Sequence, residues 1–335
     1  MTRARAARRP SRRQVLRGAG LAGIGWLAAC AQVTLPTMPS RRPAVVGLLA
    51  AGPPPPRDAL AAFLQGLAER GWALGHNLVL AERSADGQDD RLPDLAAALL
   101  ALPPDALVTV GTPATRAAAA ATTAIPIVFA SGRKPAAPAG ADSGQAFGGN
   151  VTGIATGSAE VTERRLMLLA ALAPGVARVA VLACEPATPP AVQQAAQAAG
   201  VQLYAVAMPS PGGLSRSLEA AAAWGAEALL IEPPALTPAV AAAIAAFAAD
   251  RRLPALAAAA DYPRAGGLAA YAPRLVDGFR RAAAYVDQVL RGTPPAALPV
   301  EPPGALDLVL SQRAARALGL SFSADLLRQA AEVIS

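Results

Sequence analysis

The chain has 335 residues, of which 53% are hydrophobic and 16% charged, and its formal net charge is +7 at neutral pH. Seven of the 30 basic residues and none of the 23 acidic ones precede Cys30, so the rest of the chain is formally neutral. A neutral body argues against nucleic-acid binding, which requires a basic surface. With two cysteines and one histidine in the whole chain, we expect no metal site, and Cys184 alone cannot form a disulfide within the body.

The N-terminal segment is typical of a secretory signal. Met1–Arg13 is rich in arginine and contains no acid, and Leu16–Ala29 is apolar but too short to be a stable membrane span. We therefore expect residues 1–29 to be a signal peptide. Gly18–Gly23 matches the dinucleotide-binding pattern GxGxxG, but no strand precedes it and it lies inside the signal, so we reject that interpretation.

Two short motifs refine this prediction. Ser11–Leu16 resembles the twin-arginine export motif, and Leu27–Cys30 resembles the lipobox of bacterial lipoproteins, in which the cysteine is lipidated. Residues 30–43 are then a lipidated tether, and the body is expected in the periplasm or on the outer face of a membrane. A Sec-type signal and an uncleaved anchor remain alternatives, and either still places the body outside the cytoplasm.

Beyond the leader, short apolar runs alternate with helical segments. The predicted strands are Ala44–Leu49, Leu78–Glu82, Ala106–Val110, Ile125–Phe129, Arg178–Leu182, Gln202–Ala207, Ala228–Ile231, Leu253–Ala260 and Leu306–Leu310. The predicted helices are Asp58–Gly71, Arg91–Leu102, Ala114–Ala121, Thr162–Leu172, Pro190–Ala199, Leu214–Trp224, Pro238–Asp250, Leu275–Leu290, Ser311–Leu318 and Ala324–Ile334. Strand, helix and strand in succession form the βαβ unit of parallel sheets. Because this alternation occurs in both halves, we predict an α/β fold of two doubly wound lobes.

The turn Gly111–Pro113 lies between a predicted strand and a predicted helix. Free backbone N–H groups and the helix dipole attract anionic ligand groups at such a position. Thr112 can cap the helix and offer a hydroxyl to a ligand, and Pro113 suits the first helical position. An ordinary helix cap is the alternative reading of this turn.

Polar residues follow several other predicted strands, at the edge where open α/β sheets bind ligands. The candidate ligand-binding residues are Thr112, Thr115, Ser131, Glu185, Glu232, Asp261 and Tyr262. Thr112 and the N–H groups after it suit a carboxylate, and the three acids suit an amine. Tyr262 is expected either to stack on a planar ligand or to pack in the core. Each of these residues is otherwise an ordinary cap or turn residue.

Stretches along the whole body resemble one known family, the substrate-binding proteins of ABC transporters. These stretches are Phe63–Trp72, Gly75–Leu78, Gly111–Ala114, Ile125–Phe129, Gly148–Gly153, Gly266–Leu268, Tyr271–Pro273, Phe279–Ala283, Tyr285–Asp287, Leu298–Pro302 and Ala317–Leu320. They are most similar to the bacterial lipoproteins that bind tryptophan and tyrosine. The resemblance implies the type I periplasmic-binding-protein fold.

The resemblance also implies an organisation and a set of partners. Lobe I comprises residues 44–150 plus about 274–297, and lobe II comprises residues 151–273 plus about 298–335. Three hinge crossovers, near Val151–Ala155, Leu268–Tyr271 and Leu306–Leu310, join the lobes. The expected partners are a small solute (an amino acid or a related polar or aromatic molecule) and an ABC permease. The lipid anchor is expected to attach the protein to the membrane. We expect a monomer without a cofactor.

Two loops depart from the family pattern. Lys134-Pro135 stands where the family commonly has Asp-Pro, and Glu185-Pro186 stands where it commonly has Asn-Pro. These changes of charge favour a different or modified ligand. No Ser-His-Asp order, GxSxG or Walker motif is present, so an enzyme is not expected. The alternative function is a ligand-sensing lipoprotein that acts on a membrane signalling partner without transport.

Overall fold

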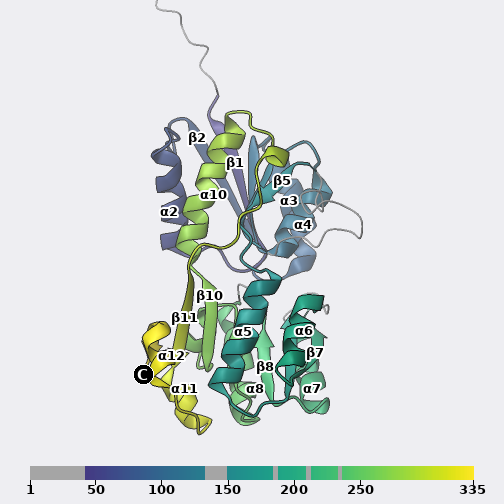
Figure 1. The fold of residues 1–335 in the computed structure, drawn as a ribbon. Helices are drawn as coiled ribbons and strands as arrows, with labels where there is room; N and C mark the ends of the chain where they lie inside the picture. Colours follow the sequence, from purple (N-terminus) through teal and green to yellow (C-terminus); the bar gives the residue numbers. More distant parts are fainter. Residues whose placement is uncertain (1–41, 133–148, 184–187, 209–212, 233–235) are drawn as a thin grey trace, which may run out of the picture. The chain divides into compact units, whose positions relative to one another are not determined.

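The computed structural model describes residues 42–132, 149–183, 188–208, 213–232 and 236–335. They form two β-sheets, of five and seven strands, with helices packed against both (Figure 1). Every pairing is parallel except that of β10 with β11. No helix among the described residues is long and apolar enough to cross a membrane. The predicted α/β fold with parallel sheets is confirmed.

The first sheet has the strand order β2-β1-β3-β4-β5. Its strands are β1 (Ala44–Ala50), β2 (Leu78–Ser84), β3 (Ala106–Val110), β4 (Ile127–Ser131) and β5 (Val151–Gly153). Its helices are α2 (Arg57–Ala68), α3 (Leu92–Leu100), α4 (Thr112–Ala121) and α10 (Leu275–Leu290). Strand β3 is buried at every position, as expected for a central strand of a parallel sheet covered on both faces.

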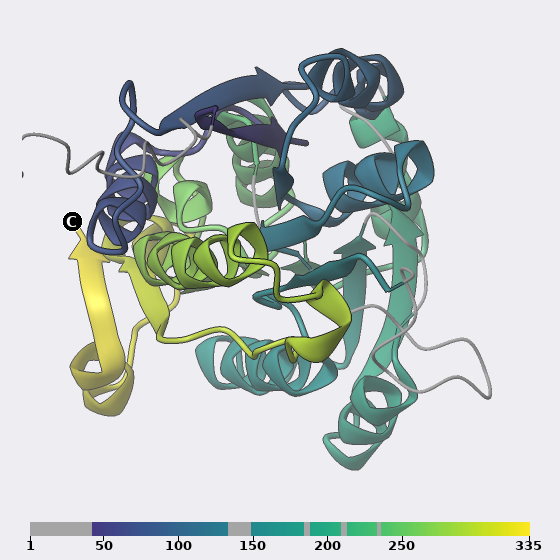
Figure 2. The same ribbon diagram turned by 90° about the horizontal axis from the view of Figure 1, so that it is seen from above.

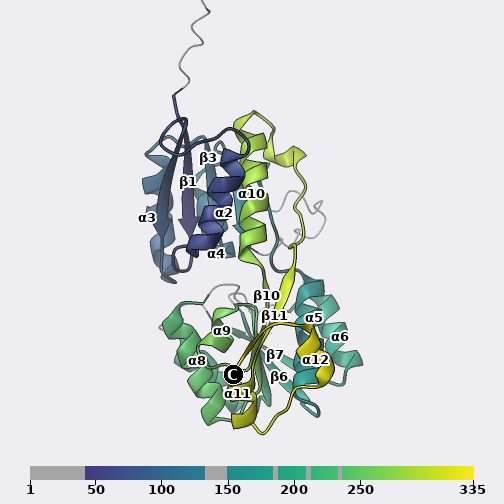
Figure 3. The same ribbon diagram turned by 90° about the vertical axis from the view of Figure 1, so that its left-hand side faces the viewer.

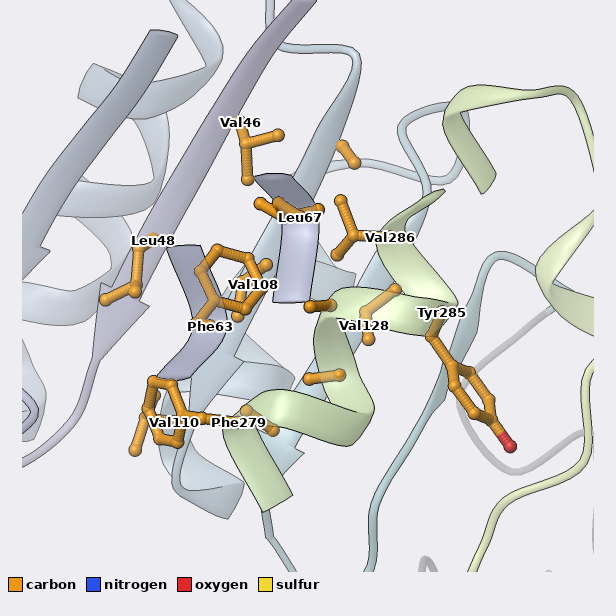
Figure 4. Close-up of a cluster of buried hydrophobic side chains, with 14 of the residues drawn as sticks. Val46, Leu48, Phe63, Leu67, Val108, Val110, Val128, Phe279, Tyr285 and Val286 are labelled. Atoms are coloured by element: carbon orange, nitrogen blue, oxygen red, sulfur yellow. The ribbon is translucent and has the colours of Figure 1, made fainter. Parts of the chain in front are cut away.

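Helix α10 completes the core of the first sheet although it lies far away in the sequence. It packs beside α2, as Figures 1 and 3 both show. Phe279 of α10 meets Phe63 of α2 edge to face, with ring centroids 6.4 Å apart. Valines of the sheet, among them Val108 and Val128, belong to the same buried cluster as these rings (Figure 4). Each such fully buried side chain contributes about 1.5–3 kcal/mol through removal of apolar surface from water.

The second sheet has the strand order β12-β11-β10-β9-β8-β6-β7. Its strands are β6 (Arg178–Ala183), β7 (Gln202–Ala207), β8 (Ala228–Ile231), β9 (Ala255–Ala257), β10 (Ala269–Pro273), β11 (Leu306–Ser311) and β12 (Ala330–Ile334). Its helices are α5 (Ala159–Leu172), α6 (Pro190–Ala198), α7 (Leu214–Ala223), α8 (Pro238–Asp250), α9 (Asp261–Arg264), α11 (Gln312–Ala317) and α12 (Ala324–Gln329). Leu229 and Leu230 of β8 belong to two different core clusters, so both faces of this sheet are covered.

The prediction of a closing helix over Ala324–Ile334 is wrong in its second half. Helix α12 begins after Ser323, whose hydroxyl accepts the Leu326 N–H, and ends at Gln329. The chain then forms β12, which pairs in parallel with β11, and the two strands lie side by side in Figure 2. The open edge of β11 offers backbone hydrogen-bonding groups that the β-branched Val333 and Ile334 can use in a strand. The sequence of residues 324–334 does not reveal that a distant strand has an unpaired edge, so the strand could not be predicted from that sequence.

The chain passes between the two sheets three times; the first connection overlaps the expected Val151–Ala155, and the other two lie beside the expected segments. Val151–Gly153 is β5, which pairs with β4 in the first sheet. Leu306–Leu310 lies in β11, and Leu268–Tyr271 leads into β10, so both belong to the second sheet. The connections themselves are residues 154–158, Arg274, and the segment that precedes Leu306.

Hydrogen bonds tie these three connections to one another. The Ala155 N–H donates to the Glu301 carbonyl oxygen at 2.8 Å, and the Glu301 N–H donates to the Gly153 carbonyl oxygen at 3.0 Å. The Arg274 N–H donates to the Ala305 carbonyl oxygen at 3.0 Å. The Glu301 carboxylate also binds the Arg281 guanidinium of α10, which lowers the pKa of that carboxyl.

Candidate functional site

The turn between β3 and α4 is built around Gly111. Gly111 has φ +92° and is the N-cap residue of α4, so Thr112 and Pro113 are the first two helical residues. Its N–H donates to the Ser131 carbonyl oxygen at 2.7 Å, and a Cβ at Gly111 would lie 3.1 Å from the Ala51 Cβ. The expectation that Thr112 caps the helix is therefore wrong. Glycine takes the position because it alone adopts this backbone conformation without strain.

Hydroxyl groups behind the turn hold it in place. Thr115 bonds the Thr109 hydroxyl at 2.8 Å and donates to the Gly111 carbonyl oxygen at 3.2 Å. The Ser131 hydroxyl bonds that of Thr156 at 3.0 Å, and Thr156 also accepts the Gly132 N–H at 3.1 Å. All four hydroxyl-bearing residues are buried. Thr115 and Ser131, both predicted to contact ligand, thus have hydroxyls that are already bonded inside the protein.

Thr112 differs from these residues because it is only half-buried. A Cβ at Gly132 would lie 3.8 Å from the Thr112 hydroxyl oxygen, so the glycine leaves room next to that hydroxyl. Pro113 has no N–H, and the Thr115 N–H donates to the Gly111 carbonyl oxygen at 3.1 Å, so the helix dipole is the main feature that this turn offers to an anion. Thr112 at the amino end of α4 is therefore the candidate contact for an anionic or carboxylate group. Sequence reasoning missed Gly132 and Thr156, which carry no motif.

Glu232 follows β8 and forms a buried ion pair. Its Oε2 lies 3.3 Å from Arg165 Nη1 and accepts the Thr162 hydroxyl at 2.9 Å. Arg165 Nε also donates to the Tyr271 carbonyl oxygen of β10 at 2.9 Å. The side chains of Arg165 and Glu232 are 1% and 4% exposed. The pair therefore links three elements: helix α5, the residue that follows β8, and strand β10.

Glu232 Oε1 has no hydrogen-bond partner among the described residues. One oxygen of this buried carboxylate thus lacks a hydrogen bond there, while its negative charge is matched by Arg165. The arrangement favours a hydrogen-bond donor over a second full positive charge. Arg165 escaped the sequence analysis, although a signal was present: it interrupts the otherwise apolar stripe formed by Val161, Leu168, Leu169 and Leu172 of α5.

The two remaining candidates that the structure describes, Asp261 and Tyr262, differ in their exposure to solvent. Asp261 begins α9 with its side chain 60% exposed and lies 3.8 Å from Arg264 of the same helix. Tyr262 is fully buried in the core cluster of α7, α8 and β8, and burial raises the pKa of its phenol. Its ring packs against Gly267, where a Cβ would lie 2.2 Å from a ring carbon. Of the two alternatives for Tyr262, the structure shows the packing one.

Other predicted residues lie outside the described ranges. These are Cys30, Lys134, Cys184 and Glu185. Among the residues that the structure does describe, no cluster of three or more His, Cys, Asp and Glu side chains could hold a metal ion. The candidate site therefore rests on Thr112, the first turn of α4 and Glu232.

Two covered, mostly parallel sheets with polar groups at strand ends have the architecture in which open α/β proteins bind ligands. The family model for the ABC transporter substrate binding protein matches residues 55–334. The chain belongs to that family, and its fold is the type I periplasmic-binding-protein fold. No curated relative matches the chain significantly.

Solved structures with the same fold cover most of the chain. A conserved domain protein from Vibrio cholerae has a TM-score of 0.71 and 23% identity, covering 87% of this chain and 100% of its own. An ABC domain in complex with L-Trp from Streptococcus pneumonia has a TM-score of 0.73 and 22% identity, with the same coverage. A solute-binding protein from Agrobacterium vitis, bound with alpha-D-tagatopyranose, has a TM-score of 0.55 and 14% identity, covering 86% of this chain and 99% of its own. These likenesses support the fold.

Proposed function

We propose that the chain is an extracytoplasmic solute-binding protein that closes over a small ligand and delivers it to an ABC permease. The observation that carries this proposal is the family match over residues 55–334. The ligand-bound neighbours, one with L-Trp and one with a sugar, are consistent with a small polar solute. No feature of the described residues favours the alternative of a signalling lipoprotein.

The proposed lobes follow the two sheets. Lobe I contains residues 44–153 with α10, because β5 pairs with β4, and lobe II contains the second sheet and its helices. The connections at 154–158, at Arg274 and before Leu306 are the proposed hinges. Hinged lobes that close around a solute need such short joining segments. The protein is proposed to act as a monomer.

The proposed ligand contacts divide between the lobes. Thr112 and the first turn of α4 would hold a carboxylate or another anionic group. Glu232 Oε1, which lacks a partner among the described residues, would accept a hydrogen bond from an amine or hydroxyl of the ligand. Asp261 and Glu185 remain proposed contacts. Thr115 and Ser131 are proposed to act by supporting the turn that carries Thr112.

A ligand screen tests the function directly. The full chain is heated with single amino acids, nucleosides, monosaccharides and small organic acids, and its unfolding midpoint is measured. A ligand at 100 times its Kd stabilises the fold by about 2.7 kcal/mol, which raises the midpoint visibly. One class of solute is expected to do so. A folded protein that responds to none of them would contradict the proposal.

The Thr112→Ala variant then tests the site with whichever solute the screen identifies. Loss of a hydrogen bond to a charged ligand group costs about 1.5–3 kcal/mol, so we expect affinity to fall at least tenfold. Thr123→Ala, at an exposed position beyond the other end of α4, is the matched control and should bind as the wild type does. Equal affinities of the two variants would place the ligand elsewhere.

The lipid anchor is a separate proposal, since Cys30 lies outside the described residues. In cells that export and lipidate the chain, Cys30→Ser should move the protein from the membrane fraction to the soluble extracytoplasmic fraction, because a thioether-linked lipid can no longer form. Cys184→Ser is the control and should stay with the membrane. Retention of the Cys30→Ser protein on membranes would remove the lipoprotein assignment.

A further inference from the structure

A cavity of about 270 Å³ lies in the second lobe, away from the candidate site. Its walls come from α8, from the residues that precede β9 and β10, and from α11. Figure 3 shows α8, α9 and α11 grouped at this part of the fold. The parallel strands β9 and β10 begin here, whereas Glu232 follows the end of β8, so the cavity lies at the opposite edge of the sheet.

The cavity has an apolar wall and one buried polar group. Alanine, glycine and leucine residues, including Ala248, Leu253 and Leu318, form most of the lining. Tyr262 lines it too, and its hydroxyl is buried without a hydrogen-bond partner among the described residues. Its Cζ lies 2.3 Å from where a Cβ at the lining residue Gly267 would stand, so the ring packs directly against that residue. An unbonded buried hydroxyl is costly, and a bound acceptor would satisfy it.

A positive charge stands at the exposed side of the same cavity. Arg313 of α11 is one of the lining residues and is exposed, and its Nη2 lies 3.8 Å from the Cβ position of Gly266. No carboxylate in the described part of the chain pairs with Arg313. By contrast, the nearby Arg264 is paired with Glu332 at 2.8 Å and with Asp261. Arg313 is therefore the cation available to a ligand here.

We propose that this cavity is a second binding site, which takes a small carboxylate with an apolar body. The apolar part would lie against Ala248 and Leu253, the carboxylate would pair with Arg313, and the Tyr262 hydroxyl would donate to an oxygen of the ligand. Burial raises the pKa of the Tyr262 phenol, so the group stays a donor at physiological pH. Pockets for drug-sized ligands span about 300–1,000 Å³, so this one suits a smaller molecule.

Two fluorinated probes test this proposal on the full chain. Binding of 4-fluorobenzoate and of its neutral counterpart 4-fluorobenzyl alcohol is followed through broadening of the ¹⁹F resonance of each probe. We expect saturable binding of the benzoate at millimolar concentration. Arg313→Gln should weaken benzoate at least tenfold and the alcohol less than twofold, because only the benzoate carries the charge. Arg316→Gln, on the same helix but outside the cavity lining, should change neither.

Two further variants locate the bound probe. Tyr262→Phe keeps the ring and should weaken both probes, while its unfolding midpoint is equal to or above that of the wild type, because the unbonded hydroxyl is removed. Ala314→Leu, at a half-buried lining position, should abolish binding of both. Absence of saturable benzoate binding to the wild-type chain, equal binding to Arg313→Gln and Arg316→Gln, or binding that survives Ala314→Leu would each overturn the proposal. A small organic acid that raises the midpoint in the solute screen is assigned to one site by these variants: Arg313→Gln and Ala314→Leu abolish a shift that comes from this cavity and keep one that comes from the Thr112 site.

Discussion

Replacing Arg165 by methionine is expected to destabilise the protein by about 3–5 kcal/mol, because it leaves the Glu232 carboxylate buried without its cation. The two side chains are 1% and 4% exposed, so water cannot compensate for the lost guanidinium. The hydrogen bond from Arg165 to the Tyr271 carbonyl oxygen is lost as well. Denaturant unfolding, followed by circular dichroism, measures the change in the free energy of unfolding.

Two companion variants separate the buried charge from a general effect of losing arginine. Arg328→Met breaks an ion pair with Asp325 whose partners are 72% and 66% exposed, and it should cost less than about 1 kcal/mol. The double variant Arg165→Met with Glu232→Leu removes both charges and should recover most of the lost stability. If the double variant is as unstable as Arg165→Met alone, packing and not the unpaired carboxylate explains the loss.

Gly153→Ala is expected to cost about 3 kcal/mol or more, because the new Cβ has no room. It would lie 2.1 Å from the Phe129 carbonyl oxygen and 2.6 Å from the Phe129 nitrogen, which are backbone atoms of the neighbouring strand. Gly153 and Phe129 are register partners between β5 and β4, so relief requires the two strands to separate. The measurement is again the free energy of unfolding.

Gly149→Ala is the matched control for this effect. A Cβ at Gly149 would meet only the Ala296 Cβ, at an ordinary distance of 3.9 Å, so stability should stay within about 0.5 kcal/mol of the wild type. Because Gly153 is the last residue before the first connection, the Gly153→Ala variant should also alter ligand affinity if that connection is a hinge. Equal stabilities of the two alanine variants would show that β5 does not depend on its close approach to β4.

Local sequence patterns predicted many elements correctly. The predicted bounds of Ala106–Val110, Gln202–Ala207, Pro238–Asp250 and Leu275–Leu290 coincide with β3, β7, α8 and α10. These segments are long or have a clear apolar pattern for a strand or a helix, and Gly or Pro often marks their ends. The family resemblance, carried by stretches such as Gly111–Ala114, is confirmed by the family match over residues 55–334.

The site was less predictable, because polarity at the end of a strand does not say where a side chain points. Thr115 and Ser131 follow the expected strands, yet their hydroxyls bond to Thr109 and Thr156 inside the protein. Thr156 comes from the connection after β5, and nothing in the local pattern relates it to Ser131. Burial of a hydroxyl depends on which neighbours fold over it, and those neighbours are distant in sequence.

The sequence by itself determined the class of fold, the alternation of strands and helices, and the family, because these depend on local apolar patterns and short motifs. Only the tertiary structure decided that Ala330–Ile334 pairs with β11 as a strand, that Gly111 caps α4, and that Arg165 neutralises Glu232. Each of these depends on a partner brought close by folding: an open sheet edge, a neighbouring strand, or a buried charge. Those partners set the energy of each feature, and they are far away along the chain.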